Sequence, residues 1–259
     1  MSYMSTTLHA GDLTAVVDSE CGARVTSLRI NNTEILVTQG SSSLEWGLYP
    51  MVPFAGRLRD GQLHFDDATF QLPINSPPHA LHGLLFDTPW QIESVSHSDI
   101  TLSASLGQIW PFPSVVHHHI SLTATHLRCE LSISGQRTMP VQLGWHPWFA
   151  APQDIEFNFS SMLRRDTDGI TTTERTEPLD PPVDDCFLEP NAWPRIHSGG
   201  HVWEVASDCP YWVRYDAPDG NVCIEPQSGP PNGLNTIPLI LEAGQQFSRW
   251  MEIRLLPRQ

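Results

Sequence analysis

A period of two in the apolar residues is the feature that most restricts what this chain can fold into. In the segment HHHISLTATHLRCELSIS, polar residues alternate with Ile120, Leu122, Leu127, Leu131 and Ile133. Successive side chains of a β-strand point to opposite faces, so the pattern predicts two half-buried strands joined near residues 124–126. Signals for helices are scarce throughout the sequence, and the chain is therefore expected to be all-β.

The same pattern recurs in short segments that are separated by turn residues. LTAVV, RVTSLRI and EILV follow one another near the start, and the turn residues GD, ECGA and NNT beside them predict a meander. Further strands are expected at WQIESV, DITLSASL, VQLGW, HVWEVA, YWVRYD, NVCIEP and WMEIRLL. No internal repeat or low-complexity linker divides the sequence, so a single domain is expected over residues 1–259.

Composition excludes several classes of function. The formal net charge of -15 at pH 7 disfavours nucleic acids and anionic membrane surfaces as partners, because both would be repelled at long range. All 14 basic residues are arginines, and the sequence contains no lysine. Schiff-base chemistry, a lysine-bound pyridoxal phosphate and the lysine of a phosphate-binding loop are thereby excluded. Catalysis is left to histidine, carboxylates, arginine, tyrosine or cysteine.

The five cysteines are odd in number, widely spaced and never arranged as CxxC. They are expected to be free thiols in a reducing cytosol, and they signal neither a zinc site nor a disulfide framework. The N-terminal stretch MSYMSTTLHAGDL lacks the basic and apolar regions of a signal peptide. No run of residues is long and apolar enough to span a bilayer. A cytoplasmic location is expected.

Two short segments far apart in the sequence are interpreted as the two halves of one acid–base site. These are LGWHPWF around His146 and VCIEPQSGPPNGLN around Glu225. Each candidate proton carrier precedes a proline, which bars it from the helical region and holds its backbone extended. The segments PFAGRLRDGQLHF around Arg57 and HALHGL around His82 complete the pattern.

These segments, in this order, resemble the aldose 1-epimerase (galactose mutarotase) family. The resemblance runs from GARVTSL through PFAGR, LHG, WPFP, MPVQLGWHPWF and DDCFL to IEPQSGPPN, which is nearly the whole chain. The sequence is closer to the compact bacterial branch of the family. The resemblance implies a large, many-stranded antiparallel β-sandwich with a sugar site in a cleft on one face of a sheet. It also implies an isomerase that interconverts sugar anomers without a cofactor.

Interconverting anomers requires removal of the C1 hydroxyl proton, protonation of the ring oxygen and rotation of the C1 group, and two positioned acid–base groups supply the proton steps. Glu225 is the candidate base, and partial burial would raise its pKa toward a useful value. His146 is the candidate acid, donating from Nε2 to the ring oxygen. The alternatives are a surface glutamate at a strand end and a buried, hydrogen-bonded histidine among aromatic residues. The family match favours catalysis for both residues.

Two further residues are assigned to the sugar by the resemblance. His82 in LHG resembles the second active-site histidine of the family, which lies near the ring oxygen. His79 is the alternative, and the glycine after His82 favours His82. Arg57 in PFAGR resembles the arginine that holds sugar hydroxyls, a geometry that a guanidinium fork suits well. Many members carry asparagine directly before this arginine, whereas this chain has Gly56.

The remaining candidates bind the sugar ring. Asp184 in VDDCFL lies where the family carries an aspartate that accepts hydrogen bonds from ring hydroxyls, and spacing to the following phenylalanine favours it over Asp185. Trp148 is a candidate to offer its indole face to the sugar, as are Trp110 and Phe54, although core packing is the commoner role for such residues.

No metal or other cofactor is expected. At most two histidines of the run at residues 117–119 share a strand face, and no nearby carboxylate or cysteine completes a ligand set.

The expected partner is a small sugar, and the chain is expected to be a monomer or a homodimer. A glycoside hydrolase would need two carboxylates flanking one bond, and Glu225 has a histidine as its evident partner instead. A hexose-phosphate mutarotase and a non-catalytic carbohydrate-binding protein are the alternatives that stay open. An unphosphorylated sugar is favoured, because Arg164–Arg165 is the only adjacent basic pair.

Overall fold

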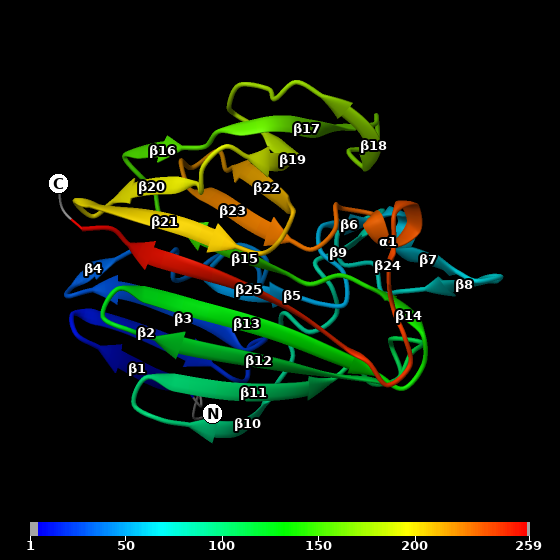
Figure 1. Ribbon diagram of the computed structural model, residues 1–259, viewed down its shortest axis with the longest axis horizontal. Coiled ribbons are helices and arrows are strands. Elements are labelled where there is room, and N and C mark those ends of the chain that lie inside the picture. Colours follow the sequence, from blue (N-terminus) through cyan, green and yellow to red (C-terminus); the bar gives the residue numbers. More distant parts are fainter. Residues whose placement is uncertain (1–4, 258–259) are drawn as a thin grey trace.

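The computed structural model describes residues 5–257, and strands make up most of it (Figure 1). Residues 1–4 lie outside this range. They are the start of the N-terminal stretch in which no signal peptide is expected. The described helices are the 3₁₀ turn η1 (Arg59–Gly61) and the short helix α1 (Gly233–Thr236). Neither is long and apolar enough to cross a membrane.

An 11-stranded antiparallel sheet carries the functional residues described below. Its order is β1-β2-β3-β5-β15-β23-β22-β19-β17-β18, with β4 paired to β3. Its strands are β1 (Ser5–Ala10), β2 (Leu13–Asp18), β3 (Arg24–Ile30), β4 (Thr33–Glu34), β5 (Leu48–Met51), β15 (Gly144–Phe149), β17 (Phe159–Arg165), β18 (Thr171–Thr176), β19 (Asp184–Pro190), β22 (Tyr211–Asp216) and β23 (Val222–Gln227).

An 8-stranded antiparallel sheet forms the second layer, in the order β10-β11-β12-β13-β25-β21-β20-β16. Its strands are β10 (Gln91–Val95), β11 (Asp99–Ser105), β12 (Ser114–Leu122), β13 (His126–Gly135), β16 (Asp154–Glu156), β20 (Arg195–Ser198), β21 (His201–Ser207) and β25 (Gln246–Leu255). Three two-stranded pairs complete the described strands, namely β6 (Arg57–Leu58) with β9 (Ala80–Leu81), β7 (Gln62–Phe65) with β8 (Ala68–Gln71), and β14 (Met139–Val141) with β24 (Leu239–Leu241).

The two large sheets share one apolar core. Trp145 and Ile224 contribute to this core from the 11-stranded sheet, and Ile120, Leu131 and Ile253 contribute from the 8-stranded sheet. β12 and β13 bury alternate side chains, as the period of two predicts, whereas the central strands β15 and β23 are buried on both faces. The predicted all-β fold, a large many-stranded antiparallel β-sandwich, is therefore confirmed.

Several predicted strands have the expected positions, and others differ. The alternating segment forms β12 and β13, with the turn at residues 123–125. VQLGW was expected to be one strand, but the chain leaves β14 after Val141 and enters β15 at Gly144, in a different sheet. EILV contributes only Glu34 to β4.

The strands between residues 154 and 190 escape the sequence analysis. Along β18 only Thr171 is buried, and the strand is otherwise rich in threonine and charge. Such a strand at the edge of a sheet has little apolar alternation to detect, because one side of it faces solvent. These are the strands that bring Arg165, Thr171 and Asp184 to the site described next.

Candidate active site

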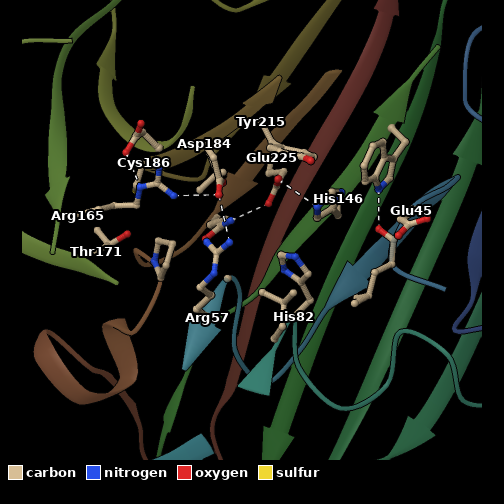
Figure 2. Close-up of a pocket in the computed structure, with 18 residues that line it drawn as sticks. Glu45, Arg57, His82, His146, Arg165, Thr171, Asp184, Cys186, Tyr215 and Glu225 are labelled. Atoms are coloured by element: carbon tan, nitrogen blue, oxygen red, sulfur yellow. Dashed lines mark hydrogen bonds and ion pairs between the residues drawn. The ribbon is translucent and has the colours of Figure 1, made fainter. Parts of the chain in front are cut away.

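A cavity of about 340 Å³ lies on the face of the 11-stranded sheet that points away from the core. Alternate residues of its central strands line the cavity, which follows from the period of two. They are His146 and Trp148 on β15, Glu225 and Gln227 on β23, Val213 and Tyr215 on β22, and Asp184 and Cys186 on β19. Loops and short strands supply the opposite wall, with Leu44, Glu45, Gly56, Arg57, Leu81, His82 and Pro231 (Figure 2).

Glu225 and His146 meet at the floor of this cavity. The paired residues Gly144–Gln227 and Trp148–Cys223 on β15 and β23 place the two side chains opposite one another. Nε2 of His146 lies 3.2 Å from Oε1 of Glu225, and the residues are only 4% and 2% exposed (Figure 2). Both residues are extended and precede a proline, as the sequence predicts. The structure therefore brings the two candidate proton carriers into direct contact.

Burial governs the charge of this pair. It raises the pKa of the Glu225 carboxyl well above its ordinary value, and Asp184 raises it further, whereas Gln227 and Arg57 act in the opposite direction. Burial also lowers the pKa of His146 well below its ordinary value, and His82 and Arg24 add to that effect. Both shifts favour the uncharged form of each group. With both groups uncharged, one proton belongs to the Glu225 carboxyl, whose Oε1 lies 3.2 Å from the imidazole nitrogen that competes for it.

Two aromatic rings hold the His146 imidazole. Tyr49 stacks on it at 4.8 Å between ring centroids, and Trp148 stacks at 5.5 Å. The Tyr49 hydroxyl and the Trp148 indole nitrogen both donate to the carbonyl oxygen of Leu44, at 3.1 and 2.8 Å. Trp148 thus lines the cavity and fixes His146, while Trp110 and Phe54 lie in the core between the sheets.

His82 reaches the cavity from the turn that follows β9. Its ring meets that of His146 edge-on at 4.7 Å between centroids, and its backbone nitrogen donates to the carbonyl of Gly56. Burial, with a smaller contribution from Arg57, lowers the pKa of His82 to about 3, so the ring is neutral. His79 lies elsewhere, with Nδ1 accepting from the backbone nitrogen of Asp60 at 3.1 Å.

The glycine after His82 has a steric cause. Gly83 has φ of +82°, and a Cβ at this position would lie 2.2 Å from the carbonyl oxygen of Val52. Only glycine fits a backbone so close to its neighbour. The LHG signal in the sequence therefore reflects the turn that aims His82 into the cavity.

Arg57 and Asp184 form the polar end of the cavity together with Arg165. Oδ2 of Asp184 accepts from Nη2 of Arg57 at 3.2 Å and from Nη1 of Arg165 at 2.9 Å (Figure 2). Asp185 forms an ion pair with Nε of Arg165 at 2.9 Å. Both aspartates line the cavity, and Asp184 is the one that links the two arginines. Arg164 is exposed and pairs with Glu174.

Sequence reasoning did not find Tyr49, Gln227, Arg165 or Glu45. Gln227 could have been identified, because it lies two residues after Glu225 and so faces the same side of the strand. The other three depend on strand pairings and loop positions that no local pattern records. Tyr49, for example, reaches His146 because β5 pairs with β15.

Two groups of histidines bear on metal binding. In the run on β12, His118 points into the core and accepts from the Trp145 indole nitrogen at 3.3 Å, while His117 and His119 are partly exposed on the other face. His82, His146 and Glu225 offer ligand atoms that all lie within 4.8 Å of one another. Two histidines and a glutamate are also the ligands of some catalytic zinc sites. The absence of a metal requirement therefore stays a prediction, which chelation tests.

Comparisons with known proteins agree with this architecture. A family model described as aldose 1-epimerase matches residues 4–254. The protein YphB of Escherichia coli K12 is 36% identical over 110 residues, a match that spans 39% of this chain and only 36% of YphB. A crystal structure of a candidate aldose 1-epimerase from Escherichia coli K12 has a TM-score of 0.87 at 22% identity, covering 98% of this chain and 99% of that one. Galactose 1-epimerase from Lactobacillus acidophilus NCFM has a TM-score of 0.81 at 18% identity, covering 97% and 94%. The two structural matches show a common fold.

Proposed function

Because this chain belongs to the aldose 1-epimerase family, we propose that it interconverts the α and β anomers of an unphosphorylated aldohexose. The reaction proceeds by general acid–base opening and closure of the sugar ring. One observation carries the proposal, namely the buried contact of 3.2 Å between Glu225 and His146 at the floor of a cavity of about 340 Å³. A pure sugar-binding protein needs neither proton carrier.

Transfer of one proton from Glu225 to His146 converts both groups to the forms that the reaction needs. When a sugar binds, the proton passes from Oε1 of Glu225 to Nε2 of His146, which breaks the O–H bond and forms an N–H bond. The resulting carboxylate takes the proton of the C1 hydroxyl, and the imidazolium gives its proton to the ring oxygen as the C1–O5 bond breaks. After these transfers the sugar is an open-chain aldehyde, and Glu225 and His146 are again both uncharged, which is the state that burial favours. Rotation about the C1–C2 bond followed by the reverse steps yields the other anomer.

The remaining residues of the cavity position the sugar. His82 lies beside His146 and is suited to place the ring oxygen. Arg57 and Asp184 offer donors and acceptors for the hydroxyl groups that are remote from C1. Trp148 is held edge-on to Tyr215 and borders the cavity, where part of its ring is available to the C–H side of a sugar.

Optical rotation tests the proposal directly. Freshly dissolved α-glucose and α-galactose should approach anomeric equilibrium faster with the protein than without it. Glu225→Gln keeps the shape of the side chain and removes its basicity, so it should leave no more than a few per cent of kcat while sugar binding persists. Glu174→Gln, at an exposed residue, is the matched control and should retain wild-type activity.

The outcomes separate the alternatives. Sugar binding without any acceleration would identify a non-catalytic carbohydrate-binding protein. Substantial activity in Glu225→Gln would require another base. Prolonged chelation should leave the rate unchanged, and a loss that a divalent ion restores would show that His82, His146 and Glu225 act as metal ligands.

A phosphorylated aldose is the second candidate, because Arg57 and Arg165 both line the cavity. The two guanidinium groups are matched by Asp184 and Asp185, so the cluster offers no net positive charge to an anion. The comparison is kcat/KM for glucose against glucose 6-phosphate at moderate salt. An advantage of about tenfold or more for the phosphate, lost in Arg165→Ala and kept in Arg164→Ala, would favour the phosphorylated substrate.

A further inference from the structure

Gln227 makes a contact with Glu225 that none of the roles above uses. It lies two residues after Glu225 on β23 and is fully buried. Its Nε2 donates a hydrogen bond to Oε2 of Glu225 at 3.1 Å. Gly144 on β15 and Tyr211 on β22 flank it in the sheet. The pairing of a central strand on both sides thus fixes where this residue lies in the sheet.

The other end of the amide has no partner. Oε1 of Gln227 is buried and accepts no hydrogen bond in the part of the chain that the structure describes. A buried polar atom without a partner opposes folding, and an apolar side chain of the same shape would avoid that cost. Gln227 has such an unpartnered atom and lies beside the two candidate proton carriers. A role in function therefore explains this residue better than a role in stability.

The bond from Gln227 distinguishes the two oxygens of the Glu225 carboxyl. Oε2 is occupied as an acceptor, so the proton of the carboxyl belongs on Oε1. Oε1 is the oxygen that lies 3.2 Å from Nε2 of His146. We propose that Gln227 is a positioning residue which, by donating to Oε2, confines the shared proton to Oε1 on the line to His146. This inference rests on the proposed epimerase function, whose proton passes along that line.

Other charged and titratable groups also lie around Glu225, and Asp184 and Arg57 among them shift its pKa. They are His146 on β15, Tyr49 on β5, Asp184 and Cys186 on β19, Cys223 on β23, Arg57 on β6 and His82 after β9. Gln227 differs from these groups because it does not titrate and because its side chain donates a hydrogen bond to the Glu225 carboxyl group. Its loss therefore changes one bond and leaves the charges of the cavity in place.

Gln227→Met tests the proposal, because methionine has nearly the same length and shape but no donor. We expect kcat to fall by about tenfold to a hundredfold while KM changes little, since the carboxyl loses its orientation. The alkaline limb of the pH profile should move to higher pH, because a bond that favours the carboxylate is gone. The melting temperature should be unchanged or higher, because the unpartnered carbonyl is removed.

Gln142→Met is the matched control. Gln142 is also a buried glutamine, but it is not among the residues that line the cavity, and it donates to the carbonyl of Pro230 at 2.9 Å. Its replacement should lower the melting temperature and leave both limbs of the pH profile in place.

A double variant gives a second check, because Gln227→Met should have no further effect on the residual rate of Glu225→Gln if Gln227 acts through Glu225.

Titration of the Glu225 carboxyl by ¹³C NMR measures the effect of Gln227 on its pKa without any substrate turnover. The Glu225 carboxyl should titrate at higher pH in Gln227→Met than in the wild type, so this measurement succeeds or fails independently of the proposed reaction. A shift to lower pH would mean that the amide accepts the carboxyl proton instead, and it would overturn the inference. An unshifted titration with a lowered melting temperature would assign Gln227 a structural role and would overturn it equally.

Discussion

Contact between Glu225 and His146 gives the pair properties that neither residue has alone. Each group is driven toward its uncharged form, and the two atoms that compete for the proton are 3.2 Å apart. The pair therefore titrates as a unit. The pKa values for binding its first proton and its second proton both differ from the ordinary values of the two groups. At the residue scale, this is the physical basis on which the proposed catalysis is expected to operate around neutral pH.

The pH dependence of kcat/KM should reflect these shifts. Activity requires one proton on the pair, so it falls at acid pH when His146 takes up a second proton, well below its ordinary pKa of 6.5. It falls at alkaline pH when Glu225 releases the shared proton, well above its ordinary pKa of 4.5. Polarimetry across the pH range, corrected for the spontaneous rate, measures both limbs. An alkaline limb at 6.5 would contradict the assignment, because it would be the titration of an ordinary histidine.

At the scale of elements, the turn after β9 determines where one side of the site lies. His82 has φ of +61°, and Gly83 follows it with φ of +82°. The backbone nitrogen of Leu84 then donates to the carbonyl of Val52 at 2.8 Å, which ties the turn to the end of β5. Close approach of the two backbones leaves no space for a side chain at Gly83, so the position of His82 depends on this contact.

Gly83→Ala should therefore displace the turn. The added Cβ would lie 2.2 Å from the carbonyl oxygen of Val52, and the backbone angle is strained for alanine. We expect a loss of about 1–3 kcal/mol in the free energy of unfolding, together with a lower kcat/KM because His82 moves. Gly200→Ala is the control, since φ is +74° and nothing lies within 4 Å of the added Cβ. Equal effects of the two changes on activity would show that backbone strain alone, and not the contact with Val52, is responsible.

At the scale of the whole molecule, the same strands build the core and the site. On β15, Trp145 packs between the sheets while His146 faces the cavity, and on β23 Ile224 and Glu225 divide in the same way. The Trp145 indole also donates to His118 of the opposite sheet, which links the two layers next to His146. The strands that carry the site are thus packed against the core on their opposite face.

Burying an ionisable group in this framework affects the stability of the protein. The raised pKa keeps Glu225 protonated in the folded state at pH values where the unfolded chain, with an ordinary pKa of 4.5, has released the proton. The stability from this group is therefore complete below pH 4.5 and is lost as the pH rises through the raised pKa.

Glu225→Gln should consequently be more stable than the wild type at neutral pH. Glutamine does not titrate, so the difference in melting temperature should be small below pH 4.5 and should increase as the pH rises. Calorimetry of both proteins across this range measures the difference. A difference that does not vary with pH would mean that Glu225 is not held protonated in the folded protein.

The sequence by itself determined the fold class and the two central residues. Alternation along a strand is a local property, so it predicts strands wherever one face is strongly apolar, as in β12 and β13. The prolines after His146 and Glu225 restrict the backbone locally as well, and both residues are extended as predicted. Resemblance to the family then indicated that the two segments belong to one site.

Only the tertiary structure decided which side chains join them. Tyr49 stacks on His146 because β5 pairs with β15, and Arg165 reaches Asp184 because β17 pairs with β19. Asp184 and Asp185 are adjacent in the sequence, and only their contacts show that Asp184 bridges Arg57 and Arg165. Pairing between strands that are distant in sequence depends on the packing of the whole core, which no local pattern encodes.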